Sequence, residues 1–464
     1  MRRELHYRVS LAVEAECAYA WHEHISAFNR LSPAWESTRM LSSEGIREGG
    51  RAVIAIPSPL GPLHWHAEHF DIQKGREFSD RQLKGPFRFW VHRHLFERAA
   101  PGTCTLHDII RYELPLSPIS DLFAGWFVRR KLAAMFAYRH RVVSNDLAFW
   151  NLLPERKVKR ILLTGSSGLV GSALAQFLQQ GGYEVIGVSR RSGAGIPTVI
   201  WDLNNQNPSD ASLLLDGQPL DAVVHLAGES IADGRWSEAR KQQLVRSRVD
   251  ATHNLISGLQ KLGLAPRVFV SASGVGLYGD RGSEILTEES APGGGFLGEL
   301  AQAWEAAARA SETAFSARSV QLRMGAVLTP RGGALAKMLL PFKCGVGGVL
   351  GTGQQWMSWV ALDDVLYAIT YALETQSLSG AVNLVSPHPV TNAEFTRVLA
   401  QVLKRPAVLP VPAFALRLGL GALADELLLN SQRAVPKALL ASGFEFRHAD
   451  LSSALSFMLG KNRI

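Results

Sequence analysis

The sequence predicts an α/β fold built on a doubly wound, Rossmann-like parallel sheet, preceded by an α+β domain in which a curved sheet holds a long helix. Three observations support this prediction. A glycine-rich turn at residues 165–171 follows a short apolar run. Strand-length apolar runs alternate with helical stretches over residues 158–375, which is typical of βαβ units. Residues 1–150 instead show successive short strands followed by one long helix.

The composition is that of a globular chain with no sign of a nucleic-acid or membrane partner. Of 464 residues, 47% are hydrophobic, and the net charge of +8 is spread along the chain. Cys17, Cys104 and Cys344 are far apart and form no CxxC pair, which favours a reducing compartment. The N-terminus lacks a signal-peptide core, and no run of about 18 apolar residues occurs. We therefore expect a cytoplasmic protein without a membrane span.

Residues 1–150 form the first expected domain, followed by a polar linker at 151–157. This domain contains ten of the fourteen histidines. Its expected strands are 6–13, 51–57, 63–71, 77–84, 87–96 and 104–114, and its expected helices are 18–28 and 119–145. A curved sheet wrapped on the long second helix would leave a cavity between them.

Five histidines of this domain, His64, His66, His69, His92 and His94, suggest a metal site. His64 and His66, like His92 and His94, stand two apart, so each pair shares one face of a strand. No Asp, Glu or Cys completes an obvious ligand set with them. We therefore expect no metal, and interpret these residues as part of a polar wall or a solvent face. The aromatic residues between them are interpreted as core.

The glycine-rich turn has the layout of a dinucleotide site. Gly165 permits a tight turn, Gly168 lets the backbone approach a pyrophosphate, and Gly171 lets the next helix pack closely on the strand. The N-terminus of that helix offers free N–H groups to the phosphates. The expected cofactor contacts here are Gly165, Ser166, Ser167, Gly168, Leu169 and Gly171.

The ends of the following strands favour NADP(H) over NAD. The strand at 183–189 ends at Arg190 and Arg191, where an acidic residue would bind a ribose 2′-hydroxyl, and guanidinium groups suit a 2′-phosphate instead. After the next strand, Asp202 and Leu203 are placed near the adenine. The strand at 222–226 ends in small residues that would let the cofactor lie against the backbone. The contacts expected there are Ala227, Gly228 and Glu229.

Spaced motifs over residues 158–464 resemble the YfcH-type epimerase family, a branch of the extended short-chain dehydrogenases/reductases. The matching stretches are 164–171, 225–229, 234–236, 247–249, 273–280, 322–325, 351–360, 363–364, 383–392, 405–406 and 443–444. The resemblance implies a NADP-binding domain at 158–380, a small C-terminal domain at 381–464, and a cofactor contact at Arg248. It also places Arg235, Trp236, Arg323, Gln355 and Trp359 on the substrate side.

Residues 1–150 are similar, more loosely, to the helix-grip START/Bet v 1-like fold, on residues 31–36, 85–87, 92–94 and 138–140. That resemblance implies a domain that binds an apolar small molecule.

The Ser-Tyr-Lys triad of this superfamily is absent. In extended members the Ser stands four residues before the Tyr of a V-Y-G turn; here that position is Gly274, beside Ser273. The helix that should begin with Tyr-x-x-x-Lys offers neither residue. We take Tyr278, Glu229 and Ser273 as catalytic candidates. Tyr278 and Glu229 lie in turns after strands on the expected cofactor side, and Ser273 is the neighbour of the expected Ser position.

Three functions stay open at this point. The chain is expected to be a NADP-dependent oxidoreductase acting on an unknown small molecule without the usual triad. Alternatively it is a non-catalytic NADP(H)-dependent sensor or scaffold coupled to a hydrophobic-ligand domain. A third possibility is a sugar-nucleotide-type epimerase or dehydratase. The sequence indicates neither the substrate nor the oligomeric state.

Overall fold

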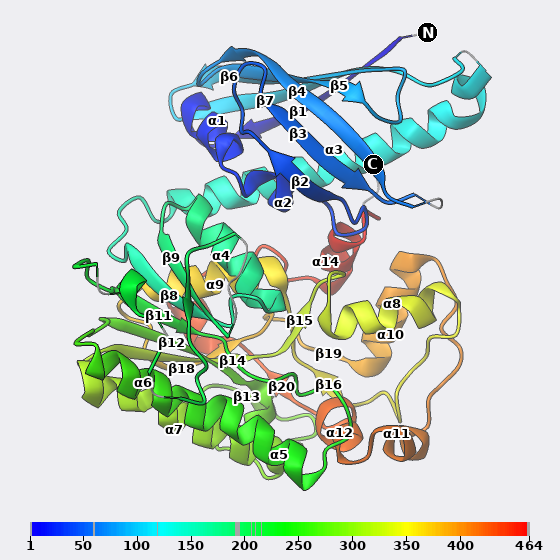
Figure 1. Cartoon of the computed structure of the whole chain (residues 1–464). Helices are drawn as coiled ribbons and strands as arrows, with labels where there is room; N and C mark the ends of the chain where they lie inside the picture. The colour runs from blue at the N-terminus through cyan, green and yellow to red at the C-terminus, as the bar shows by residue number, and fades with distance from the viewer. Residues whose placement is uncertain are drawn as a thin grey trace. The chain divides into compact units, whose positions relative to one another are not determined.

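The computed structural model describes residues 2–58, 61–117, 119–190, 195–205, 207–208, 210–214 and 216–461. The chain divides into two compact units, one comprising Met1–Glu155 with Ser456–Ile464 and the other Arg156–Leu455. Figure 1 shows the ribbon, with the first unit mainly in blue and cyan. The segment 456–464 clusters with the first unit, whereas the sequence suggested that it belongs with residues 381–455.

The first unit is a seven-stranded antiparallel sheet with three helices. The strand order is β1-β7-β6-β5-β4-β3-β2, and Figure 1 shows the long α3 running along the sheet. The strands are β1 (Arg3–Leu11), β2 (Arg39–Ser43), β3 (Arg51–Ile56), β4 (Leu63–Gln73), β5 (Glu77–Lys84), β6 (Phe89–Ala100) and β7 (Thr103–Glu113), and the helices are α1 (Ala15–Glu23), α2 (Ala27–Leu31) and α3 (Ile119–Asn151). Each predicted strand is present. The edge strand β2 was missed because it is mostly exposed and shows no alternation.

Part of the face of this sheet toward α3 is filled by apolar side chains. Buried Trp90, Ile110 and Tyr112 pack with Leu132 and Phe136 of α3. The ring of Phe136 also stacks on that of Tyr7, with centroids 4.7 Å apart. Aromatic pairs of this kind contribute about 0.5–1.5 kcal/mol beyond their area burial. Of the aromatic residues predicted as core, Trp65, Phe87 and Trp90 belong to or pack against this cluster and Phe96 is buried, whereas Phe70 and Phe89 line a groove on the other face.

The second unit contains the predicted Rossmann-like sheet. All seven strands are parallel, in the order β10-β9-β8-β11-β12-β14-β18. They are β8 (Arg160–Thr164), β9 (Glu184–Ser189), β10 (Thr198–Ile200), β11 (Ala222–His225), β12 (Val268–Gly274), β14 (Arg318–Met324) and β18 (Gly380–Leu384). Every residue of β8 and β11 is buried, because helices cover both faces of a parallel sheet.

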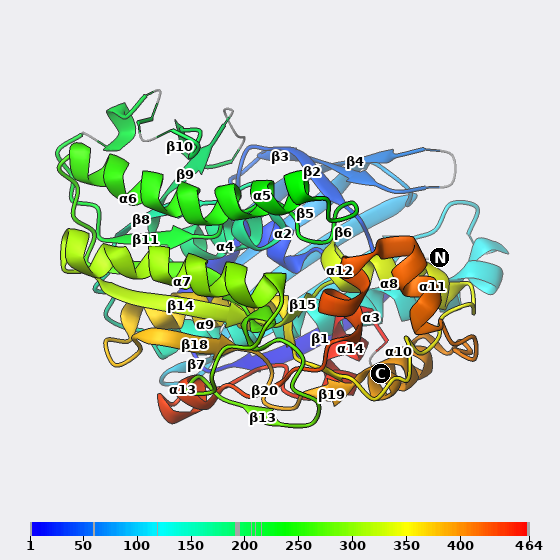
Figure 2. The same ribbon diagram turned by 90° about the horizontal axis from the view of Figure 1, so that it is seen from below.

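The helices of this unit pack on the sheet in two layers. Helices α6 and α7 contact each other, as do α4 and α9, and Figure 2 shows α6 and α7 side by side. Those attached to the sheet are α4 (Leu169–Gln180), α5 (Glu238–Val245), the π-helical turn η2 (Arg246–Asp250), α6 (Ala251–Lys261), α7 (Phe296–Phe315) and α9 (Leu362–Glu374), with the 3₁₀ turns η1 (Ser212–Leu214) and η3 (Val275–Tyr278).

Short elements complete the unit. The paired strands are β13 (Ile285–Leu286) with β20 (Arg433–Ala434), β15 (Ala326–Leu328) with β17 (Trp359–Ala361), and β16 (Trp356–Met357) with β19 (Val390–Thr391). The helices are α8 (Gly333–Lys343), α10 (Asn392–Leu403), α11 (Ala413–Leu420), α12 (Ala422–Ala424), π-helical η4 (Asp425–Leu429) and α13 (Lys437–Ala441), and the division between the two units falls within α14 (Leu451–Met458). No helix in the described part of the chain is long and apolar enough to cross a membrane.

The strand order reverses at β8. The chain proceeds from β8 to β9 and β10 on one side, then returns to place β11 on the other side. Where the order reverses, the loops after two adjacent strands diverge and leave a crevice at their carboxyl ends. The glycine-rich turn after β8 and the segment after β11 meet at that point.

Candidate functional site

The turn between β8 and α4 is shaped by two glycines. Gly165 has a φ of 70°, and a Cβ there would lie 2.8 Å from the carbonyl carbon of Leu226. A Cβ on Gly171 would lie 2.1 Å from the Gly165 carbonyl oxygen. The backbone of the turn therefore lies close to the backbone that follows β11, and α4 packs closely on the turn. An L side chain at either position would displace backbone.

Gly168 plays a different part. It is the N-cap of α4, with a φ of −76° that any residue adopts. A Cβ there would meet only the Gly165 carbonyl oxygen, at 3.2 Å. The backbone conformation at Gly168 therefore does not require glycine. The geometry is compatible with our expectation that the missing side chain leaves space for a ligand. The first turn of α4 has no side-chain cap within the described chain, so its N–H groups are available to an anion.

A buried histidine joins the two strands beneath this turn. His225 Nδ1 lies 2.7 Å from Thr164 Oγ1, and its Nε2 lies 3.0 Å from Thr252 Oγ1. Thr164 Oγ1 in turn accepts the backbone N–H groups of Leu226 and Ala227. Burial, with the neighbouring Arg248 charge, lowers the pKa of His225 to about 4. The imidazole is therefore neutral and holds the ends of β8, β11 and α6 in register.

At the expected ribose end, Arg190 is exposed directly after β9. Arg191 lies outside the described residues. Asp202 Oδ1 accepts the backbone N–H and side-chain amide of Asn204, so this carboxylate closes a local turn. Leu203 packs on the hydrophobic core below the strand ends.

Arg248 is the most unusual cation of the unit. It is 6% exposed, and its Nη2 donates to the Glu229 carbonyl oxygen at 2.8 Å. Its buried Nε has no hydrogen-bond partner among the described residues. Burial lowers its pKa to about 10. It lies in the π-helical turn η2 and packs under Gly228, where a Cβ would come within 3.1 Å of its guanidinium carbon. A buried donor of this kind fits a polar or anionic group bound over the Gly228 turn.

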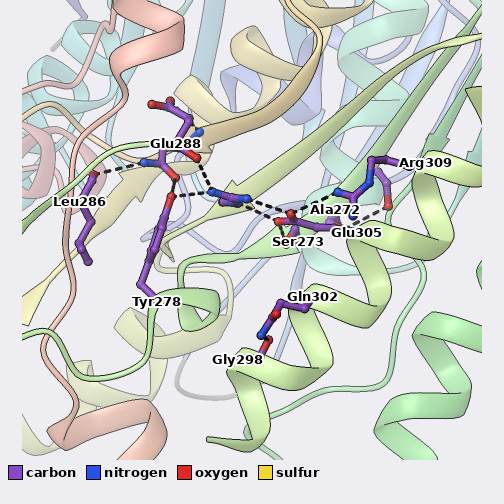
Figure 3. A network of polar contacts seen from close by, with 12 residues as sticks. Ala272, Ser273, Tyr278, Leu286, Glu288, Gly298, Gln302, Glu305 and Arg309 are labelled. Atoms are coloured by element: carbon purple, nitrogen blue, oxygen red, sulfur yellow. Dashed lines mark hydrogen bonds and ion pairs between the residues drawn. The ribbon is translucent and has the colours of Figure 1, made fainter. Parts of the chain in front are cut away.

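The residues that we took as catalytic belong in part to a buried network (Figure 3). Tyr278 is fully buried, and its hydroxyl donates to Asn383 Oδ1 at 2.7 Å while it accepts from Arg323 Nη1 at 3.0 Å. Ser273, 4% exposed, donates to Glu305 Oε1 at 2.8 Å. Arg323 makes a bidentate ion pair with Glu305, at 2.8 and 3.0 Å. In this structure both hydroxyls that we expected to face a substrate are hydrogen-bonded to side chains inside the fold.

The three residues that stand where we expect the triad have no titratable side chain. Gly274 ends β12, and on α7 both Leu297 and Ala301 are buried, each in a hydrophobic cluster. Ala301 packs in the same cluster as Tyr278. No side chain at these three positions can hold or transfer a proton.

The residues expected on the substrate side divide into two groups. Arg323, Gln355 and Trp359 are buried. Arg323 pairs with Glu305, Gln355 Nε2 donates to the Leu350 and Leu428 carbonyl oxygens, and Trp359 Nε1 donates to the His388 carbonyl oxygen. Trp359 is the first residue of β17.

The other two lie nearer the surface. Arg235 is exposed, and its guanidinium donates to the Leu418 and Gly419 carbonyl oxygens. Trp236 packs beside Phe296, with ring centroids 5.3 Å apart.

Glu229 is the acidic candidate that keeps access to solvent. Its side chain is 34% exposed and stands 3.5 Å from Arg240 Nη1. It follows Gly228 at the carboxyl end of β11, beside Arg248.

Sequence reasoning missed His225, Glu305 and Asn383 as parts of this region. Each has its partner more than 15 residues away, so no local spacing shows the contact.

A parallel sheet with a glycine turn at its switch point and a buried arginine beside it defines a Rossmann-type dinucleotide-binding protein. The chain belongs to the epimerase family: residues 161–384 match the NAD dependent epimerase/dehydratase family, and residues 411–458 match a domain of unknown function, DUF1731.

Relatives agree with this assignment. Epimerase family protein Mb2239 of Mycobacterium bovis is 40% identical over 297 residues, which are 64% of this chain and 96% of that protein. Epimerase family protein SDR39U1 of Homo sapiens is 36% identical over 301 residues, 64% of this chain and 98% of that protein.

Two solved structures are similar. The nucleoside-diphosphate sugar epimerase from Corynebacterium glutamicum has a TM-score of 0.78 and 32% identity, covering 98% of this chain and 90% of that one. Human SDR39U1 with NADPH has a TM-score of 0.58 and 33% identity, covering 65% of this chain and 99% of that one. The match to the bacterial structure therefore includes the N-terminal unit.

Proposed function

We propose that this chain binds NADP(H) and is an atypical reductase of the extended short-chain dehydrogenase/reductase class, acting on a small molecule. The observation that carries the choice of NADP(H) is the exposed Arg190 directly after β9, which forms no ion pair with a described residue. An acidic residue at this position would repel a 2′-phosphate, whereas a guanidinium binds it. The human relative solved with NADPH supports the proposal.

Three groups of residues would form the cofactor-binding site. The uncapped first turn of α4 and the Gly165–Gly168 turn would hold the pyrophosphate. Arg190 would bind the ribose phosphate. The segment from Ala227 to Glu229, backed by the buried guanidinium of Arg248, would lie along the nicotinamide half.

A bound nicotinamide would donate or accept a hydride. The chain supplies no triad to move the accompanying proton, because Gly274, Leu297 and Ala301 occupy those positions. Glu229, half-exposed at the end of β11, is the side chain we assign to proton transfer or to orientation of a water molecule. A reaction that needs a hydride and one proton from solvent, such as reduction of a polarised double bond, fits this arrangement better than oxidation of an unactivated alcohol, which needs a strong base.

A non-catalytic NADP(H) sensor is the second candidate. The observation that favours it is the replacement of each triad side chain by a group without a titratable proton. A sugar-nucleotide epimerase in the strict sense has less support, because epimerisation through a keto intermediate needs the base that is missing here.

For the first unit, we propose a START/Bet v 1-like role in binding an apolar molecule. The antiparallel sheet and the long α3 support this fold. The face toward α3 is occupied in part by the apolar cluster. A groove of about 870 Å³ lies on the other face, where Phe70, Phe89 and Val91 line it together with the charged Glu48, Asp71, Glu77, Arg93 and Arg111. That groove is the place where we would look for the ligand.

The experiment that tests the function has two steps. Isothermal titration of the full-length protein with NADPH and with NADH should show at least tenfold tighter binding of NADPH. Steady-state oxidation of NADPH is then measured with a panel of enones and carbonyl compounds. Turnover with any member supports a reductase. Tight NADPH binding without turnover across the panel favours the sensor, and equal affinity for the two cofactors contradicts the choice of NADP(H).

A further inference from the structure

A cluster of two carboxylates and three imidazoles lies in the first unit, on the face of the sheet that meets α3. Asp80 is on β5, His92 and His94 are on β6, Asp108 is on β7 and His140 is on α3. The register places Asp80 opposite His92 and His94 opposite Asp108. All of them except Asp80 are buried. Four elements therefore bring ionisable side chains to one point inside the fold.

We propose that Asp80, His92 and His94 bind a divalent first-row transition-metal ion such as Zn²⁺. Asp80 Oδ2 lies 3.3 Å from His92 Nδ1 and 3.8 Å from His94 Nε2, and the three ligand atoms all lie within 4.8 Å of one another. Bonds of about 2.0–2.2 Å to a tetrahedral ion place neighbouring ligands about 3.4 Å apart. The three atoms thus already stand at separations that one ion can bridge with small side-chain movements.

Asp108 lies beside the nitrogens of His92 and His94 that face away from Asp80. Its Oδ1 lies 3.0 Å from His92 Nε2 and 2.8 Å from His94 Nδ1, and its Oδ2 lies 2.6 Å from His140 Nε2. Each of the two β6 imidazoles therefore has one nitrogen toward Asp108 and the other toward Asp80. A carboxylate that accepts the far N–H of a metal-bound histidine fixes its tautomer and its orientation. Here Asp108 is hydrogen-bonded to His92 and His140, and its Oδ1 lies near His94 Nδ1, which has no hydrogen-bond partner among the described residues.

Three protein ligands leave at least one position on the ion open. Two imidazoles and one carboxylate are the donor set of many catalytic zinc sites and of the facial triad of non-haem iron. The Asp80 side chain is 18% exposed, so solvent reaches the edge of the site. Water or a small ligand would complete the coordination. The sequence predicted no metal here because the carboxylates are on neighbouring strands and not beside the histidines.

Binding of Co²⁺ to the full-length protein tests the proposal. After treatment with a chelator, Co²⁺ is titrated while the visible absorption of the ion and the bound stoichiometry are measured. We expect one ion per chain with a spectrum of nitrogen and oxygen ligands, displaced by Zn²⁺. Asp80→Asn, which keeps the side-chain shape at a partly exposed position, and His94→Gln should each lower the affinity at least tenfold. Asp108→Asn, a positioning change, should lower it 10–100-fold, the usual range for outer-shell partners.

The matched control is a second histidine pair. His6 Nδ1 and His107 Nε2 lie 3.0 Å apart on β1 and β7, with Glu4 at 2.9 Å from His6. His107→Gln should leave Co²⁺ binding unchanged. Circular dichroism and the urea midpoint verify that each variant is folded. Failure of the wild-type protein to bind Co²⁺ at one equivalent, unchanged affinity in folded Asp80→Asn, or an equal loss in His107→Gln would each overturn the proposal.

Discussion

Ser273 donates its hydroxyl to Glu305 at 2.8 Å, and both side chains are buried. Glu305 also holds Arg323 in a bidentate pair, and Arg323 donates to the hydroxyl of Tyr278. The two hydroxyls nearest to the expected triad are thus parts of one structural network that joins β12, η3, α7 and β14. We therefore expect Ser273 and Tyr278 to contribute to the stability of the fold, and assign the proton-transfer step to Glu229 instead.

Tyr278→Phe should destabilise the protein without abolishing chemistry in the molecules that stay folded. The change leaves Asn383 Oδ1 and one Arg323 donor without their partner, which costs about 1–3 kcal/mol. The urea midpoint of the variant measures the loss.

Glu229→Gln should have little effect on stability but should lower turnover at least tenfold, which is about 1.4 kcal/mol of transition-state stabilisation. A large drop in turnover per folded Tyr278→Phe molecule would return Tyr278 to the catalytic candidates.

Arg190→Ala should weaken NADPH binding by about 10–100-fold and leave NADH binding nearly unchanged, because only NADPH carries the phosphate that the guanidinium would bind. Isothermal titration with both cofactors measures the difference. Arg267→Ala is the control, since Arg267 is an exposed cation that pairs with Asp221 at the opposite end of the strands. Equal losses for the two cofactors would contradict the proposed contact.

Substitutions at two glycines should have different effects. Gly171→Ala places a methyl group 2.1 Å from the Gly165 carbonyl oxygen, so the turn must move and we expect about 1–3 kcal/mol of destabilisation. Gly168→Val should leave the fold intact, because φ is −76° and the nearest atom is 3.2 Å from a Cβ, but its side chain would enter the phosphate space. Thermal melting and NADPH titration distinguish the two. Retained NADPH affinity in the Gly168 variant would contradict the position of the cofactor.

His225 should make stability fall in mild acid. The pKa of His225 in the folded protein is about 4, below the usual value of 6.5. Between these two pH values the imidazole is protonated in the unfolded chain but neutral in the folded protein. Stability is therefore fully present above pH 6.5 and is lost as the pH falls from 6.5 toward 4, by an amount on the order of 3 kcal/mol. Urea unfolding at several pH values measures the loss. His225→Gln should be less stable at pH 7 but should show a smaller slope across this window, and an identical slope in both proteins would show that other groups cause it.

Local patterns in the sequence were sufficient for the architecture of the second unit. The run at 160–164, the glycine spacing at 165–171 and the alternation of strands and helices predicted a parallel sheet with a nucleotide turn, and the structure contains it. Such features depend on residues a few positions apart, whose backbone conformation and burial follow from short-range periodicity. The same applies to the strands and the long helix of the first unit.

Contacts between distant residues were decided only by the tertiary structure. Tyr278 follows β12 and Ser273 lies near its carboxyl end, where catalytic residues occur in this fold, yet their hydroxyls bond partners 105 and 32 positions away. His92 and His94 appeared to lack an acidic partner until strand register brought Asp80 and Asp108 beside them. The sequence by itself determined which side chains share a strand face and where the chain turns. Which of them meet depends on register and packing between elements far apart in the chain, because these arise from the summed burial of many residues and leave no local spacing in the sequence.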